Sequence, residues 1–95
     1  MSAGEKIRLA HILTHPKRFQ IIEALRGDNQ LYIAEIADKI EDDRRIASFH
    51  IRVLEKAGLV TTELAQKIPK KGNPVLVRYV RLTPKTLELL KSCDL

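Results

Sequence analysis

The segment from Leu31 to Val60 contains two short apolar periodicities separated by a polar turn, and this pattern limits how the chain can fold. In each half, apolar residues recur at steps of three and four positions, which is the spacing of one buried helix face. The apolar positions are Leu31, Ile33, Ile36, Ala37 and Ile40 in the first half, and Ala47, Ile51, Leu54 and Gly58 in the second. The pattern predicts two short amphipathic helices, the second with arginine and lysine on its outer face.

The turn between the two predicted helices contains three consecutive acids, Glu41, Asp42 and Asp43. Asp43 is a suitable N-cap, because its carboxylate can accept hydrogen bonds from the free amides of the next turn. Two short helices joined by a tight turn, with a basic outer face on the second, are typical of a helix-turn-helix. We therefore expect this helix-turn-helix to be the functional core of the chain.

The same segment resembles a known family. Residues 48–60 read SFHIRVLEKAGLV and are similar to the run S-x-H-L-x-x-L-x-x-A-G-L-V, which ends the recognition helix of ArsR-type winged-helix transcription regulators. Residues 14–25, THPKRFQIIEAL, resemble the helix that precedes this motif in the family. The resemblance covers about residues 12–83, and its A-G-L-V ending is shared by many winged-helix proteins of the MarR-like superfamily. It implies a homodimeric DNA-binding regulator.

After Gly58 the composition changes to that of β-strands. Residues 59–64 and 75–82 are rich in Val, Leu, Thr and Tyr, whereas the loop 65–74 between them contains proline, glycine and three lysines. This pattern predicts a hairpin with a basic tip, and residues 30–32 are open to forming a third short strand. The expected fold is α+β and mainly α: a winged helix-turn-helix with about five helices and a two-stranded wing, in one domain spanning residues 1–95.

Three further helices complete the predicted fold. Helix 3–13 follows Ser2, which has capping-box spacing to Glu5, a second helix begins at Pro16 and buries Phe19 and its apolar neighbours, and helix 84–92 follows an N-capping threonine. The two terminal helices are expected to pack across a dimer axis, as the resemblance implies, with packing inside one chain as the alternative. The expected dimer-interface residues are Ile7, Leu9, Ile12, Leu13, Leu87 and Leu90.

The net charge of +5 is concentrated in one segment. Residues 66–81 contain five basic residues and no acid, whereas the rest of the chain has 12 of each. Localised positive charge is typical of a protein that binds a polyanion, because neutralised phosphates release their counterions. A solvated basic loop is the alternative, and the adjacent helix-turn-helix favours nucleic acid.

Helix 44–57 and the loop 65–74 supply the side chains expected to bind double-stranded DNA. Arginines near the start of the helix can form bidentate bonds to guanine edges, Phe49 can touch a thymine methyl, and Arg52 suits a phosphate. The loop lysines would reach the backbone or the minor groove. Alternatively, the first arginines pair with the acids of the turn, a kind of pair that contributes only about 0–1 kcal/mol. The expected DNA-binding residues are Arg44, Arg45, Ser48, Phe49, Arg52, Lys67, Lys70 and Lys71.

The acids of the turn depart from the family pattern. The family usually has Ser or Gln-type residues at the positions that match Asp43 and Arg44. Negative charge at a helix N-terminus also opposes the approach of phosphates. We expect the acids to restrict where helix 44–57 can sit on DNA.

Metal, cofactor and enzyme functions are not expected. Where arsenic and cadmium sensors of the family carry C-V-C, this chain has residues 32–34 as Tyr-Ile-Ala, and the last helix lacks the histidines of the zinc type. His50 is expected to be partly buried and hydrogen-bonded, and Cys93 to be an inert thiol, with redox sensing as the alternative. No catalytic motif is present.

The remaining features favour a cytoplasmic protein. No apolar run has the roughly 20 residues of a membrane span, the polar start is not a secretory signal, and one cysteine cannot form an intramolecular disulfide. The functional hypothesis is a homodimeric repressor that binds duplex DNA. The alternative is a winged-helix protein-interaction module without sequence-specific DNA binding, since the fold alone does not decide function.

Overall fold

The computed structural model of the protein describes residues 2–92, and within them five helices and three strands follow one another. They are α1 (Ala3–Leu13), α2 (Pro16–Gly27), β1 (Gln30–Tyr32), α3 (Ile33–Lys39), α4 (Arg44–Lys56), β2 (Val60–Lys67), β3 (Val75–Leu82) and α5 (Pro84–Ser92). The helix-turn-helix is formed by α3 and α4, and β2 and β3 form the hairpin. The predicted mainly helical α+β fold is therefore confirmed, including the third short strand.

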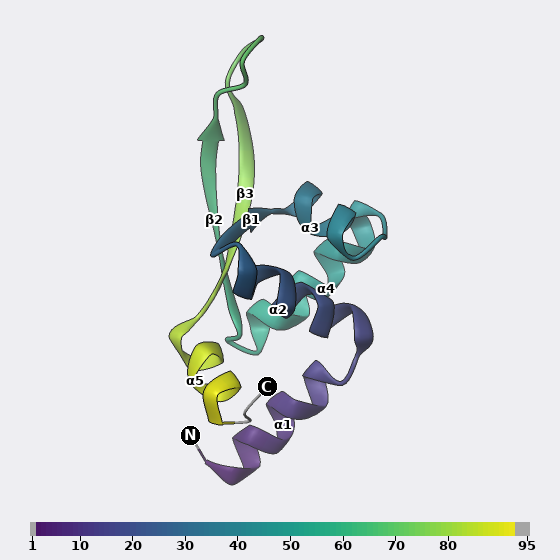
Figure 1. Ribbon diagram of the computed structural model, residues 1–95, viewed down its shortest axis with the longest axis vertical. Coiled ribbons are helices and arrows are strands. Elements are labelled where there is room, and N and C mark those ends of the chain that lie inside the picture. The colour runs from purple at the N-terminus through teal and green to yellow at the C-terminus, as the bar shows by residue number, and fades with distance from the viewer. Residues whose placement is uncertain (1, 93–95) are drawn as a thin grey trace.

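The strands form one antiparallel sheet in the order β1-β3-β2. β1 pairs only with the part of β3 around Val80, so the hairpin is two-stranded beyond this point and projects from the helices (Figure 1). We call the hairpin β2–β3 the wing, and residues 68–74 the wing tip. The long axis of the molecule, 49 Å, reflects this projection.

The strand β2 is longer than the sequence predicted. It continues past Leu64, and Ala65 and Lys67 pair with Val77 and Val75, so the loop begins at residue 68 instead of 65. The physical reason is the position of Pro69, the first residue after Val60 that cannot donate a backbone hydrogen bond to a ladder.

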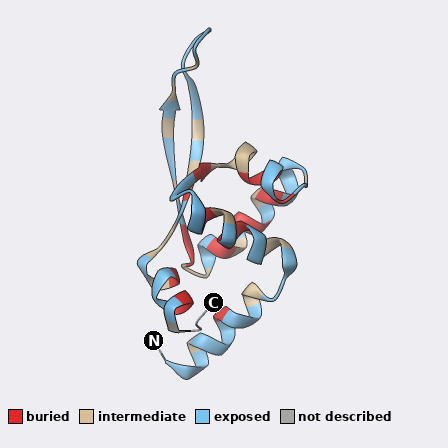
Figure 2. Ribbon diagram, viewed as in Figure 1, coloured by how far each residue is buried: buried red, intermediate tan, exposed pale blue. Residues whose placement is uncertain are grey.

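The core lies where α2, α3 and α4 meet the lower part of the sheet, with α1 and α5 closing it (Figure 2). Phe19 is 38% exposed, so the prediction that it is buried was wrong. The buried face of α2 is formed by Ile21, Ile22 and Leu25, and Arg18 occupies the remaining inward position. The side chains buried most completely are Leu9, Ile21, Ile22, Leu25, Ile36, Ile40, Leu54, Leu59, Val60, Val80 and Thr86.

Side-chain caps fix the helix starts. The amide of Ile46 donates to Asp43 Oδ1 at 2.9 Å, which confirms the predicted cap of α4. Ser2 Oγ accepts from the amide of Glu5 at 3.1 Å, but the Glu5 carboxylate does not complete a capping box. It pairs instead with Lys85 of α5, so a charge pair links the two terminal helices.

Three residues, Ala57, Gly58 and Leu59, separate α4 from β2. Gly58 has a φ of +77°, a conformation that costs other residues energy, and it turns the chain from helix to strand. The carbonyl of Leu59 accepts from Thr83 N at 3.1 Å and from the buried Thr86 Oγ1 at 2.6 Å. The start of α5 therefore holds this joint from the other side.

His50 is a buried titratable residue on the inner face of α4. Arg18 Nε donates to His50 Nδ1 at 3.3 Å, and the rings of His15 and His50 lie with centroids 4.5 Å apart. Burial lowers the pKa of His50 below 6.5, the nearby charges of His15, Arg18 and Lys17 lower it further, and Asp42 opposes them. The neutral imidazole, which can accept the hydrogen bond, is thus the form that the fold favours.

We expect the free energy of unfolding to fall as the pH drops below about 6.5, because the unfolded chain then binds a proton that folded His50 does not. Above this pH both forms are neutral and the stability is fully present. The variant His50→Gln keeps an acceptor for Arg18 but cannot titrate, so its decline should be smaller. Urea unfolding between about pH 5 and pH 8 measures the difference.

The exposed His11 of α1 provides the control. His11→Gln should keep the pH dependence of the wild type. If the decline in His50→Gln matches that of the wild type, the assignment to His50 is wrong.

Candidate nucleic-acid interface

The outer face of α4 carries the side chains expected to bind DNA. Arg44, Arg45, Phe49 and Arg52 are exposed, whereas Ser48 is half-buried. Ala47, His50, Ile51 and Leu54 bury the opposite face, and this burial fixes the rotation of the helix about its axis. The amphipathic pattern thus presents three arginines to solvent, together with the exposed ring of Phe49.

The three arginines of this face are not used inside the chain. Within residues 2–92, the side chains of Arg44, Arg45 and Arg52 make no ion pair or hydrogen bond. The structure therefore contradicts the alternative in which Arg44 and Arg45 pair with the acids of the turn. Guanidinium groups held on a helix without partners can form bidentate bonds with guanine edges or phosphates.

The acids of the turn have other roles. Asp43 caps α4. Asp42 Oδ1 accepts from the amide of Asp43 at 2.9 Å, and its other oxygen lies 3.9 Å from Lys17 Nζ. Glu41 has a φ of +55° and starts the turn. Two of the three carboxylates are therefore partly compensated by the protein itself, which reduces their repulsion of phosphates.

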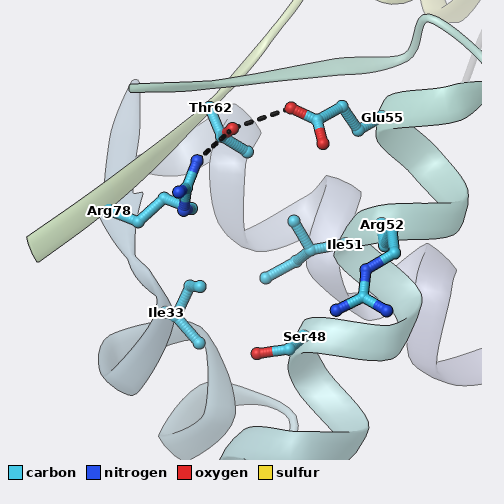
Figure 3. A pocket seen from close by; sticks show the side chains of 7 residues that line it. All are labelled: Ile33, Ser48, Ile51, Arg52, Glu55, Thr62 and Arg78. Carbon is cyan, nitrogen blue, oxygen red and sulfur yellow. Dashed lines mark hydrogen bonds between the residues drawn. The ribbon is translucent and has the colours of Figure 1, made fainter. Parts of the chain in front are cut away.

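A groove of about 350 Å³ separates α4 from the wing (Figure 3). Arg52 and Ser48 lie on the α4 side and Arg78 lies on the wing side, over a floor that includes Ile33 and Ile51. The groove is positively charged on both walls.

One carboxylate balances part of this charge. Thr62 Oγ1 donates to Glu55 Oε2 at 2.7 Å, and Arg78 Nη1 donates to Thr62 Oγ1 at 3.1 Å, as the dashed lines in Figure 3 show. This chain of hydrogen bonds ties α4 to the wing. Arg78 was not among the expected site residues, although the strand alternation puts it on the same side as the buried Val80.

The basic residues of the wing divide into two groups. Lys67 Nζ donates to Tyr32 Oη at 2.8 Å and lies 4.0 Å from the centre of its ring, and this hydrogen bond raises the pKa of Lys67. Arg81 donates to Gln30 Oε1 at 2.7 Å. These contacts fix the wing to β1. In the part of the chain that the structure describes, the side chains of Lys70 and Lys71 have no partner.

The expected site residues thus occupy two regions. Of those on α4, Ser48 and Arg52 line the groove, and Arg44, Arg45 and Phe49 do not. Lys70 and Lys71 lie at the wing tip, at the far end of the hairpin (Figure 1). Lys67 lies between the two regions and is engaged with Tyr32.

The residues expected at the dimer interface differ in how far they are buried within the single chain. Leu9 and Leu90 are buried inside the single chain, because α5 folds back against α1 and α2, so they are core residues. Ile12 and Leu13 are partly buried against the same core. Ile7 and Leu87 are 72% and 49% exposed, so a dimer contact through these two stays a prediction.

Residues 2–92 contain no group of three or more His, Cys, Asp or Glu side chains that could hold a metal ion. Cys93, for which an inert thiol was expected, lies outside the described residues. No helix among them is long and apolar enough to cross a membrane.

Solved structures similar to this chain include several transcriptional regulators. A possible transcriptional regulator for arsenical resistance is 26% identical with a TM-score of 0.63, over 88% of this chain and 77% of that one. The transcriptional regulator homologue from Pyrococcus horikoshii OT3 is 25% identical with a TM-score of 0.67, over 95% and 91%. The homodimeric winged helix-turn-helix DNA-binding domain of a possible ArsR-family regulator from Mycobacterium bovis is 20% identical with a TM-score of 0.71, over 96% and 76%, and shows the fold alone.

No curated protein matches the sequence. The sequence model of a helix-turn-helix domain family matches residues 13–63, which is more than half of the 95 residues. This match and the similar structures confirm the resemblance that the sequence indicated. The chain therefore belongs to this helix-turn-helix domain family, and its fold is that of the ArsR- and MarR-type winged-helix transcriptional regulators.

Proposed function

We propose that this protein is a homodimeric repressor that binds a specific duplex DNA site with α4 and the wing. The observation that carries the proposal is the set of three exposed arginines on α4 that have no partner within the described chain. A protein gains little stability from such groups, whereas a polyanion would complete their hydrogen bonds.

The positions of the arginines assign them different tasks. Arg44 and Arg45 lie in the first turn of α4, which is the part of a recognition helix that meets base edges in the major groove. Arg52 lies two turns further on, beside the groove that also contains Arg78. In this proposal Arg44 and Arg45 read bases, and Arg52 and Arg78 hold the phosphates of the strand that passes along the groove.

Ser48 and Phe49 complete the reading surface. Ser48 can donate or accept a hydrogen bond at the entrance of the groove, and the exposed Phe49 ring can contact a thymine methyl. Lys70 and Lys71 would contact the backbone or minor groove beyond the recognition helix, and Lys67 contributes charge while it holds the wing.

A dimer would place two recognition helices in successive major grooves about 34 Å apart. The exposed Ile7 of α1 and Leu87 of α5 support an interface at the end of the molecule opposite the wing tip (Figure 1). An apolar hollow of about 190 Å³ beside these helices, lined by Leu13, Phe19 and Leu89 among others, also supports a partner there. Occupation of DNA by such a dimer would repress transcription by excluding the polymerase.

The variant Arg45→Ala should lose about 1–3 kcal/mol of binding free energy on its preferred duplex and should discriminate less between bases at one position. Binding sites are first selected on the wild-type protein from duplexes with a randomised centre. Fluorescence anisotropy then compares a selected and a scrambled duplex. Lys6→Ala, which removes a cation from α1, is the matched control and should bind like the wild type.

The double variant Lys70→Ala/Lys71→Ala should weaken binding to both duplexes alike. Loss of two phosphate contacts should lower the slope of log K against log salt concentration by about 1.8. Anisotropy across a salt series measures this slope. If no duplex is selected and none binds at low salt, while the fold is intact, the protein-interaction alternative is favoured instead.

The variants Ile7→Asp and Leu87→Asp should convert a dimer into monomers, because a buried unpaired carboxylate costs several kcal/mol. Sedimentation equilibrium measures the mass of each variant. Val75→Asp changes a wing residue that is as exposed as Leu87 and should leave the dimer intact. A wild-type protein that remains monomeric when bound to DNA would contradict the dimer.

A further inference from the structure

The outer part of the wing exposes more apolar surface than a phosphate contact needs. Among residues 2–92, nine large hydrophobic side chains are exposed, and four of these belong to the wing: Leu64, Ile68, Val75 and Leu76. Ile68 and Leu76 are 77% and 70% exposed. Figure 2 shows that the hairpin is largely exposed beyond its base. Apolar side chains gathered on a projecting element indicate a contact surface.

The register of the strands places part of this surface on the side of the groove. Leu64 pairs with Arg78 and Leu76 pairs with Gln66, so these residues share the face that carries Val60 and Val80. Arg78 of this face lines the groove beside α4. The apolar surface therefore continues from the groove along the wing toward its tip.

Ile68 begins the wing tip and is followed directly by Pro69, Lys70 and Lys71. The tip thus combines apolar side chains with two lysines that have no partner in the described chain, and residues 66–81 contain no acid. A DNA duplex can bind both kinds of side chain: its phosphates attract the lysines, and apolar side chains can enter between its stacked bases.

We infer that the wing tip inserts Ile68 between two base pairs from the minor groove and bends the duplex. This inference rests on the proposed function, because α4 must occupy the adjacent major groove. Apolar wedges of this kind unstack a base step and kink DNA by roughly 20–90° toward the major groove. Lys70 and Lys71 would hold the phosphates on either side of the wedge.

Contact with the minor groove also accounts for the two exposed apolar residues nearer the base of the wing, Leu64 and Leu76. Entry of the tip into the minor groove brings the sugars that line this groove next to the wing face that carries Leu64 and Leu76. Deoxyribose rings can then cover these two side chains. A wing that touched phosphates alone would leave them in water.

The test uses the full chain and the duplex selected on it, labelled at its two ends with a donor and an acceptor dye. Saturation with the wild-type protein should raise the energy transfer between the dyes, because the ends approach. Ile68→Ala should lose most of this rise, and Ile68→Leu should keep it. 2-Aminopurine, placed at each step of the duplex in turn, should brighten at one step with the wild type and not with Ile68→Ala.

Val75→Ala is the matched control, because Val75 pairs with Lys67 and lies on the other face of the wing. It should bend the duplex like the wild type. Binding without a rise in energy transfer, or an equal rise with Ile68→Ala, would overturn the inference and leave the proposed function standing. Failure to select any duplex would contradict both the inference and the proposed function.

The apolar side chains of the wing could instead contact a second copy of the chain. Sedimentation of the free protein tests this alternative. Self-association that Ile68→Ala and Leu76→Ala both abolish would overturn the wedge and assign the surface to protein contact. Wing variants that sediment like the wild type support the wedge.

Discussion

The geometry of the whole interface depends on the joint between α4 and β2. Because only Ala57, Gly58 and Leu59 lie between them, the backbone angles of these three residues set the direction of the wing relative to α4. The positive φ of Gly58 makes the turn, and the two threonines that donate to the Leu59 carbonyl prevent it from opening. An added Cβ at Gly58 would find open space apart from Lys85 Nζ at 3.6 Å, so the constraint on this position is conformational, not steric.

Two further contacts brace the wing higher up. On one face, Arg78 and Thr62 connect it to Glu55 of α4, and on the other, Lys67 connects it to Tyr32 at the start of α3. Tyr32 also contacts Tyr79 edge to face, with ring centroids 6.1 Å apart. Cations that read in the sequence as one basic segment therefore serve different purposes. Lys67, Arg78 and Arg81 position the wing, whereas Lys70 and Lys71 at the tip have no partner among the described residues.

The sequence predicted what depends on local patterns. The apolar periodicity of α3 and α4, the cap at Asp43 and the turn formers of the wing each act within a few residues, so the elements they predict are present. Long-range contacts could not be predicted in this way. The partners of Lys67 and Arg78 come from other elements, and the burial of Leu9 and Leu90 depends on how α5 packs against α1. Arg78 could have been recognised from strand alternation, once Val80 was assigned to the core.

The strands of the wing have exposed, unpaired edges. β2 is an edge strand along its whole length, and β3 has no second neighbour beyond Tyr79, so both present unpaired backbone groups beside apolar side chains. Such edges promote aggregation unless charges or prolines interrupt them. Lys70 and Lys71, with Pro69 and Pro74, lie where the two strands end. Charges at these positions oppose pairing of the free wing with other copies, and in the proposed function the same two lysines attract DNA.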